Sequence, residues 1–409
     1  MERYAEYKDS VVFSFGRIPK HWLEAQLKFF CRMKSGDAIT STDIFDDGDY
    51  PVYGGNGFRG FYDQFNTEGE YSLVGRQGAL CGNVHFVQGR FWATDHAVVT
   101  YSSSKIDNKY LHYVLIEMDL NQYSQTAAQP GLSVTTILKQ KTIVPELPEQ
   151  TAIVAYLDRK TAEIDALIAD LQSQTEILDR FKRELIAKAV TKGLANSVSM
   201  KNSEVDWIGD TPSHWEVTKI KWMFEIVKRI YGKEGRDVIS ITQRGLKVKD
   251  IESNDGQLAE SYTNYQMVNV NDFAMNSMDL LTGWVDCSPF DGVTSPDYRV
   301  FRFLSGKEQC HNYYKYLFQM CYKNRIFYRL GQGVSNLGRW RLQADQFLNM
   351  RFPQPPVEEQ EKIAAYLEAK TAQVEGLIAD ITKQIEKLKQ YRQIVIHDAV
   401  TGKIKVTEG

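Results

Sequence analysis

Short loops that combine glycine with Arg, Asn or Gln are the part of this sequence best suited to contacting a ligand. Arg can pair with two acceptors on a guanine edge, and Asn or Gln can pair in the same way with adenine. Glycine beside them lets the backbone approach a ligand closely. The candidate DNA-binding residues are Asn56, Arg59, Arg76 and Gln77 in the first half of the chain, and Gln243, Arg244, Lys247, Asn336, Arg339 and Arg341 in the second.

For each of these residues the alternative is an exposed turn residue or a surface ion pair, and Arg76 and Arg339 are the strongest candidates. His96 is expected to be a core histidine bonded to the backbone rather than a base contact.

Motifs for catalysis are missing from the sequence. It has no GxxxxGK[ST] phosphate loop, no HExxH, and no Asn-Pro-Pro-Tyr or Asp-Pro-Pro-Tyr box of the kind a base methyltransferase uses. Asp107 to Lys109 has the D-x-K ending of a nuclease site, but no upstream carboxylate is suitably placed, so we interpret it as chance spacing. A non-catalytic chain without its own cofactor is expected.

The charge is close to neutral, at −3 over 409 residues. By count the first globular part carries about −3 and the second about +2, with cations gathered between Lys323 and Arg341. Phosphate neutralisation supplies most non-specific DNA affinity, so the isolated chain should bind DNA weakly. No apolar run is long enough to cross a membrane and no charged-then-apolar leader is visible, which predicts a soluble, cytoplasmic protein without a membrane partner.

The cysteines are odd in number, scattered, and form no CxxC pair, which predicts reduced thiols and no metal site. They are Cys31, Cys81, Cys287, Cys310 and Cys321.

A long stretch that occurs twice must position the loops. Residues 149–191 return as residues 359–401, displaced by 210 positions, and about 20 of the 43 aligned pairs are identical. Both copies have an apolar residue every seven positions, which is typical of a coiled-coil helix. This seam consists of Leu157, Ile164, Leu171, Leu178 and Leu185 in the first copy, and Leu367, Val374, Ile381, Leu388 and Val395 in the second.

The second seam position is expected three residues after the first. It comprises Ile153, Lys160, Leu167, Gln174 and Phe181, repeated as Ile363, Lys370, Leu377, Gln384 and Tyr391. Gly193 and Gly402 lie where the helices should end. The alternative is two unrelated amphipathic helices, each packed in its own domain.

Chain geometry favours antiparallel pairing of the two helices. About 42 residues at a rise of about 1.5 Å make a helix roughly 60 Å long. A domain that joins the end of the first helix to the start of the second is compact only if those ends are neighbours. We therefore expect an α+β protein with two globular α+β domains at opposite ends of an intramolecular antiparallel coiled coil. The expected boundaries are 1–147 for the first domain, 148–194 for the first helix, 195–356 for the second domain, and 357–409 for the second helix.

A separate apolar stripe in the last helical turns is the candidate surface for a partner. It comprises Ile186 and Val190, repeated as Ile396 and Val400. The alternative is packing against the adjoining domain.

The globular parts repeat more faintly. The stretch from Phe15 to Trp22 is echoed from Ile208 to Trp215, sharing a Gly-x-x-Pro-x-His-Trp pattern. Aromatic-rich strands flank the turn Gly54 to Gly57. A helix is predicted around Lys109 to Leu115, and a strand over Val238 to Ile241.

The order and duplication of these motifs resemble the specificity subunit of Type I restriction–modification systems. The matching motifs are the Pro-Glu-Gln-like helix starts at 145–150 and 355–360, the two Gly-x-x-Pro-x-His-Trp patterns, the Tyr-Gly-Gly-Asn-Gly turn, the Arg-x-Gly-Ala-Leu-Cys-Gly stretch 76–82, and Thr94 to Ala97. The resemblance covers essentially the whole chain.

The resemblance implies a DNA-reading scaffold without catalysis. Each globular domain would read one half of an asymmetric bipartite site in double-stranded DNA, with the helices as spacer and docking scaffold. Two methyltransferase subunits would carry S-adenosylmethionine, and restriction or translocase subunits, where present, would use ATP and Mg. The alternatives are a stand-alone DNA-binding regulator and a coiled-coil adaptor without a methyltransferase partner.

Overall fold

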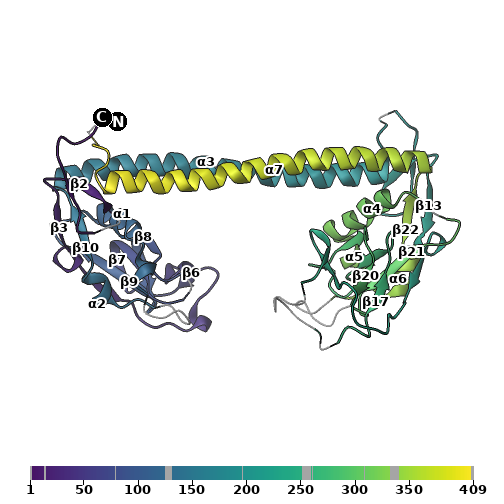
Figure 1. Ribbon diagram of the computed structural model, residues 1–409, viewed down its shortest axis with the longest axis horizontal. Coiled ribbons are helices and arrows are strands. Elements are labelled where there is room, and N and C mark those ends of the chain that lie inside the picture. Colours follow the sequence, from purple (N-terminus) through teal and green to yellow (C-terminus); the bar gives the residue numbers. More distant parts are fainter. Residues whose placement is uncertain are drawn as a thin grey trace. The chain divides into compact units, whose positions relative to one another are not determined.

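The computed structural model in Figure 1 describes residues 2–406, except 13–14, 79, 125–130, 196, 251–258, 260, 308 and 332–339. The chain forms two compact units. Unit 1 contains residues 1–172 and 382–409, and unit 2 contains residues 173–381. Each unit therefore includes part of both long helices, and the mixed helix and strand content confirms the predicted α+β class.

Unit 1 is built on a six-stranded sheet with the order β4-β9-β7-β8-β5-β6. All neighbours are antiparallel except β5 and β8. Two smaller strand pairs, β1 with β2 and β3 with β10, complete the unit. The strands are β1 (Tyr7–Asp9), β2 (Arg17–Pro19), β3 (Leu23–Gln26), β4 (Cys31–Ser35), β5 (Tyr50–Gly54), β6 (Gly57–Tyr62), β7 (Thr67–Gly75), β8 (Val84–Ala93), β9 (Ala97–Ser102) and β10 (Lys141–Val144).

Helix α1 (Asn108–Glu117) packs on this sheet, and α2 (Val134–Leu138) is a single short turn. The 3-10 turns η2 (Leu27–Phe29), η3 (Ser41–Asp43) and η4 (Leu120–Tyr123) connect the strands and helices. The predicted hairpin at Gly54 to Gly57 is confirmed, since β5 and β6 pair across it and Gly57 has a φ of +96° that favours glycine. The predicted helix at Lys109 to Leu115 is also confirmed as α1.

Unit 2 follows the same plan with a smaller sheet of order β14-β21-β18-β19 and separate two-stranded pairs. The predicted strand at Val238 to Ile241 corresponds to β15. Strands of this unit are β11 (Met200–Asn202), β12 (Asp210–Pro212), β13 (Glu216–Lys219), β14 (Phe224–Val227), β15 (Ile239–Thr242), β16 (Gly245–Val248), β17 (Gln266–Val268), β18 (Phe273–Met275), β19 (Val285–Cys287), β20 (Gly292–Thr294), β21 (Arg299–Phe303) and β22 (Arg351–Gln354). Its short helical segments are η5 (Ile220–Trp222), α4 (His311–Lys323), α5 (Ile326–Arg329) and α6 (Ala344–Asn349).

The duplicated stretches are the two long helices, α3 (Leu147–Lys192) and α7 (Val357–Val400). Gly193 and Gly402 directly follow their last turns with φ of +73° and +69°, the left-handed geometry that ends a helix. The predicted helix ends are therefore confirmed.

In each unit the two helices lie side by side (Figure 1). In unit 1 the beginning of α3 lies with the end of α7, and Arg392 donates to both carboxylate oxygens of Asp165 at 2.9 and 3.2 Å. In unit 2 the end of α3 lies with the beginning of α7, and Lys182 lies 3.2 Å from Glu375. The seam residues Leu157, Ile164, Leu367, Val374, Ile381 and Val395 are buried, and Leu171, Leu178, Leu185 and Leu388 are half-buried.

The prediction for the second seam position is wrong along most of both helices. Of its apolar members, Ile153 and Ile363 are buried, but Leu167, Phe181, Leu377 and Tyr391 are about half exposed. The positions that turn inward follow the first seam by four residues rather than three, and Thr161 and Thr371 are buried there. Their hydroxyls donate to the carbonyls of Leu157 and Leu367 at 2.8 and 2.7 Å, which satisfies a polar group inside the helix pair.

The prediction of a partner surface in the last helical turns is also wrong. Val190 and Val400 are fully buried and Ile396 almost so, each within the core of its own unit, and Ile186 packs against the same core as Val190. The tyrosine hydroxyl of Tyr313 even donates to the Val190 carbonyl at 2.8 Å. A buried side chain has no surface for another subunit, so these residues attach helix to domain instead.

Candidate nucleic-acid interface

Two loops of unit 1 that carry the candidate DNA-binding residues meet backbone to backbone. A Cβ on Gly75 would lie 2.1 Å from the carbonyl oxygen of Gly55, and a Cβ on Gly55 would lie 3.0 Å from the His96 carbonyl. Only glycine allows the loops to approach this closely. The contact brings the β5–β6 turn with Asn56 to the end of β7, directly before Arg76.

The four candidate side chains of unit 1, Asn56, Arg59, Arg76 and Gln77, are all exposed at this end of the sheet. The backbone of Arg76 is fixed from both sides, because its amide donates to His96 O at 2.9 Å and its carbonyl accepts from Leu132 N at 2.9 Å. Among the residues that the structure describes, its guanidinium is held only by a long 3.5 Å contact to the Ser35 hydroxyl. A fixed backbone with an exposed guanidinium suits a residue that contacts an external ligand.

His96 is not the core residue that the sequence suggested. Its side chain is about half exposed, and its backbone carbonyl forms the bond to Arg76. The histidine follows β8 at a turn, where the chain reverses into the buried strand β9 and the side chain is left outside. His96 therefore belongs to the same exposed surface as Arg76.

The candidates of unit 2 are gathered less tightly. Gln243, Arg244 and Lys247 are exposed in the β15–β16 hairpin, and the Gln243 amide donates to Thr282 O at 3.2 Å. Asn336 and Arg339 lie outside the described residues.

Arg341, the remaining candidate of unit 2, is also exposed, and the amide of the following Leu342 donates to Ser277 O at 3.1 Å. Gln243 and Arg341 are thus attached to opposite ends of the segment 277–282.

A cavity beside this hairpin is lined by charges of both signs. It has a volume of about 400 Å³ next to Gln243, and its charged residues are the cations Lys182, Arg183, Lys315 and Lys323 and the carboxylates Asp286, Glu368 and Glu375. Nearby, burial lowers the pKa of Arg299 to about 10, and Arg341 adds to this by repulsion. The cavity lining thus carries one more cation than carboxylate.

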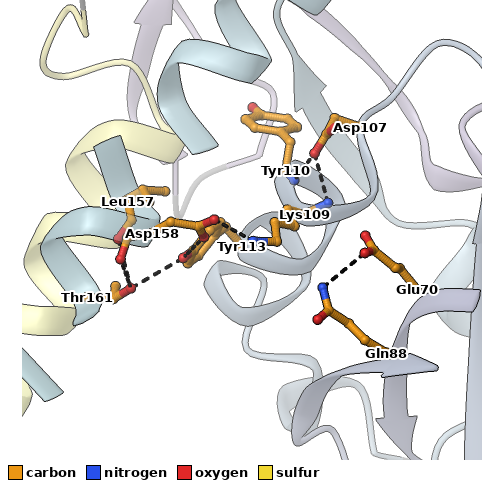
Figure 2. Close-up of polar contacts among 9 residues, drawn as sticks. All are labelled: Glu70, Gln88, Asp107, Lys109, Tyr110, Tyr113, Leu157, Asp158 and Thr161. Atoms are coloured by element: carbon orange, nitrogen blue, oxygen red, sulfur yellow. Dashed lines mark hydrogen bonds and ion pairs between the residues drawn. The ribbon is translucent and has the colours of Figure 1, made fainter. Parts of the chain in front are cut away.

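Asp107 and Lys109, the residues of the nuclease-like spacing, have structural roles (Figure 2). The Asp107 carboxylate caps α1 by accepting from the amides of Lys109 and Tyr110 at 2.8 and 2.9 Å. Lys109 lies 2.5 Å from Asp158 of α3, which also accepts from Tyr113 at 2.8 Å. The spacing reflects a helix cap and the attachment of α1 to α3.

The motifs shared by both halves contact each other. In unit 1 the Trp22 indole and His21 lie 3.1 Å from the Glu149 carboxylate. In unit 2 Trp215 and His214 lie 2.7 Å from Glu359. Sequence reasoning identified both motifs but not their contact, because a signal of spacing alone cannot pair residues more than 120 positions apart.

The glutamine after each glutamate fixes a second contact. Gln150 accepts from the Asp107 amide at 2.7 Å and donates to Pro145 O at 2.9 Å. Gln360 accepts from the Cys310 amide at 3.1 Å and donates to Pro355 O at 2.8 Å. Each Glu-Gln pair thus anchors its helix to its domain, and neither contributes to the exposed loops.

The cysteines form no disulfides with one another in the structure. Burial raises the pKa of Cys31 to about 12, and burial followed by the charge of Asp286 raises the pKa of Cys287 to about 12. Both thiols are therefore protonated at neutral pH.

Within the described ranges no group of three or more His, Cys, Asp or Glu side chains is arranged to hold a metal ion. Among the helices the structure describes, none combines the length and apolar character of a membrane span.

Comparison with known proteins places this architecture in one family. The family model described as Type I restriction modification DNA specificity domain matches residues 19–181 and 212–387. The specificity subunit of the Type I restriction enzyme EcoprrI from Escherichia coli is 37% identical over 162 residues, which cover 39% of this chain and 40% of that subunit. The putative Type I restriction enzyme MjaX specificity subunit from Methanocaldococcus jannaschii is 27% identical over 319 residues, covering 75% of this chain and 70% of that subunit.

The fold is similar to a chain in a solved structure concerned with assembly and conformational transition of the type I R-M system. The TM-score is 0.65 at 12% identity, with 95% of this chain and 99% of that chain covered. Since the family model matches both halves and most of the sequence, the chain belongs to the Type I restriction modification DNA specificity family.

Proposed function

We propose that this chain is the DNA-binding, non-catalytic specificity subunit of a Type I restriction–modification complex. Each unit reads one half of an asymmetric bipartite site in double-stranded DNA. The observation that carries this proposal is that the two units share a contact between domain and helix but differ in their exposed loops. Both units hold the same Trp-to-Glu contact, but the exposed polar loops are unlike, with Arg76 and Gln77 in one unit and Gln243 and Arg244 in the other.

The candidate DNA-binding residues act from these loops. Arg76 and Gln77 read base edges in one half-site, together with Asn56 and Arg59, and exposed His96 adjoins them. In the other half-site the contacts come from Gln243, Arg244, Lys247 and Arg341, and from Asn336 and Arg339. Support comes from the exposure of the described members and from the cations beside Gln243.

The long helices act as one antiparallel coiled coil that separates the two domains and sets the distance between the half-sites. A common register supports this. The pair Asp165 and Arg392 in unit 1 and the pair Lys182 and Glu375 in unit 2 are 17 residues apart on each helix, in opposite chain directions.

Two methyltransferase subunits bind along the helix pair, one at each unit. The supporting observation is an exposed apolar surface on the helices. It is formed by residues that were expected at the second seam position but lie outside the helix pair. Leu167 and Tyr391 in unit 1 have their repeat counterparts in Leu377 and Phe181 in unit 2. Because the helices are antiparallel, each unit receives one aliphatic and one aromatic member. The partners supply S-adenosylmethionine and adenine methylation, and restriction subunits supply ATP- and Mg-dependent cleavage.

The test is to express the chain with a Type I methyltransferase subunit that binds it and to map methylated adenines in the host DNA. The expected result is an asymmetric motif of two unlike halves about one duplex turn apart, absent when this chain is omitted. A contiguous palindrome would contradict the two-domain reading. Sequence-specific binding without any methyltransferase partner would favour a stand-alone regulator, and failure of every combination to bind DNA would favour an adaptor.

A further inference from the structure

The turns η2 and η5 present the same feature in both units: an exposed aromatic side chain with a lysine over its ring. Phe29 is 57% exposed and Trp222 is 63% exposed. The Nζ atoms of Lys28 and Lys221 lie 5.0 and 5.4 Å from the respective ring centroids, within the range of a cation–π contact. A single exposed aromatic side chain is common on a protein surface, but here one occurs at the same repeated position of both units.

The two turns have the same backbone geometry. The residues before them have φ/ψ of −70°/143° and −75°/142°, and the residues after them have −118°/−24° and −117°/−33°. Leu27 and Ile220 point into the cores and are fully buried. Their amides donate to equivalent carbonyls, those of Gln140 and Met350, at 2.9 Å in both units. The backbone geometry and hydrogen bonds that the two turns share therefore direct the aromatic ring outward.

Other exposed apolar residues of the first strands and the loops between them are not repeated. Nearby exposed apolar residues of unit 1 have no apolar counterpart, since Val11 corresponds to Glu204 and Leu23 to Glu216. Each turn also has a further cation in a neighbouring strand. Lys141 of β10 and Arg351 of β22 are counterparts, and they lie in strands paired to the strand that leads into each turn; Arg351 itself lies 3.6 Å from Glu204.

The turn lies at the opposite end of β4 from the candidate DNA surface. η2 precedes Cys31 at one end of this strand, and Ser35, which contacts Arg76, closes the other. Five residues of strand span about 15 Å. Arg76 and Phe29 therefore lie at different ends of this strand. DNA with two unlike half-sites would not require the same contact in both units. A protein partner that binds in two identical copies would require it.

We infer that η2 and η5 are two equivalent docking points for one protein partner that binds this chain twice, through a surface that combines an apolar pocket with carboxylates. This inference rests on the proposed function, in which the twice-bound partner is the methyltransferase subunit. The contact is separate from the exposed helix residues and would fix the partner to the domain as well as to the helices. Aromatic side chains in such pockets often dominate interface energies.

The experiment uses the full chain with purified methyltransferase subunit and measures stoichiometry by native mass spectrometry and affinity by titration. Phe29→Ala and Trp222→Ala should each weaken one of the two binding steps by about 30-fold, and the double variant should weaken both. Lys28→Glu with Lys221→Glu should act in the same direction. Phe45→Ala, which removes another exposed phenylalanine of unit 1, is the matched control and should bind as the parent chain does.

Folding is checked by circular dichroism and melting temperature, which should not change because these side chains are more than half exposed. If the parent chain binds two partners and the double variants bind them equally well, the inference fails while the proposed function stands. If the parent chain binds no methyltransferase subunit, the proposed function itself fails. Two further outcomes overturn the inference. Loss of DNA affinity by the isolated lysine variants would assign the turns to nucleic-acid binding. A parent chain that is a dimer while the variants are monomers would assign the turns to self-association.

Discussion

The Trp22 indole donates to the carboxylate of Glu149 across 127 residues of sequence, and this contact joins the first domain to the first turn of α3. Tyr4 donates to the other oxygen of the same carboxylate at 2.5 Å. The equivalent contact in unit 2, from Trp215 to Glu359, has a serine at the position that corresponds to Tyr4. The same frame is therefore held by more hydrogen bonds in unit 1.

Glu149→Ala should destabilise the protein more than Glu359→Ala. Each hydrogen bond to a charged group contributes about 1.5–3 kcal/mol, so we expect losses of about 3 and about 2 kcal/mol in the free energy of unfolding. Urea unfolding followed by tryptophan fluorescence would measure both. Equal losses would show that the Tyr4 bond contributes nothing.

Arg76→Ala should weaken binding of the assembled complex to its DNA site by about 5- to 150-fold and relax the base preference in one half-site only. The reason is that a guanidinium paired with a base edge contributes to one position. Arg90→Ala is the control, because Arg90 is an exposed arginine of the same sheet that is paired with Glu68 at 3.0 Å. A uniform loss over all sequences for Arg76→Ala would instead indicate a phosphate contact.

Gly75→Ala should disturb the same half-site through the backbone. The new Cβ would lie 2.1 Å from Gly55 O, so the two loops must separate. We expect a loss of about 1–3 kcal/mol in unfolding free energy together with reduced methylation at sites that need the first half. Gly376→Ala in α7, whose Cβ would meet no neighbouring atom, should leave methylation intact. Unchanged methylation in Gly75→Ala would remove this loop from the DNA surface.

Leu377→Lys and Val400→Lys should fail in different ways. Leu377 is half exposed, so its variant should fold normally and bind the methyltransferase subunit at least about 10-fold more weakly. Val400 is fully buried, and an ammonium group there should cost more than about 4 kcal/mol of stability. Thermal unfolding and partner titration separate the two effects. If Val400→Lys were as stable as the parent chain but no longer bound the methyltransferase subunit, the end of α7 would be a docking surface after all.

Stability should decrease in mild acid because of His112. Burial, followed by repulsion from Arg392 and His85, lowers the pKa of this imidazole to about 4; Lys109 adds to the lowering and Asp158 opposes it. An unfolded histidine protonates near about pH 6.5, so between these values the unfolded chain binds the extra proton. The stability from this group is present above about pH 6.5 and decreases as the pH falls toward 4, by about 2 kcal/mol at pH 5.

His112→Phe, which keeps an aromatic ring beside Phe86, provides the measurement. The difference in unfolding free energy between pH 8 and pH 5 should be about 2 kcal/mol smaller in this variant than in the parent chain. An identical pH dependence in both proteins would mean that His112 does not titrate in this range.

The sequence by itself determined the long helices, their ends and their duplication. These features follow from local rules, since a seven-residue apolar repeat specifies a helix face and a glycine at positive φ ends it. It also located the glycine-rich loops, because the turn chemistry of Gly54 to Gly57 depends on adjacent residues only.

Only the tertiary structure decided which apolar positions face inward. Thr161 and Leu167 flank the first seam of α3 on opposite sides, and the sequence favours burial of the leucine side. The threonine is buried because its hydroxyl bonds to the preceding turn, and because packing of the second helix and the domain fixes the rotation of the whole helix. The same reason buries Val190 and Val400 in the domain cores, exposes His96 beside Arg76, and brings Trp22 to Glu149. Each of these outcomes depends on contacts between segments distant in sequence, which no local pattern encodes.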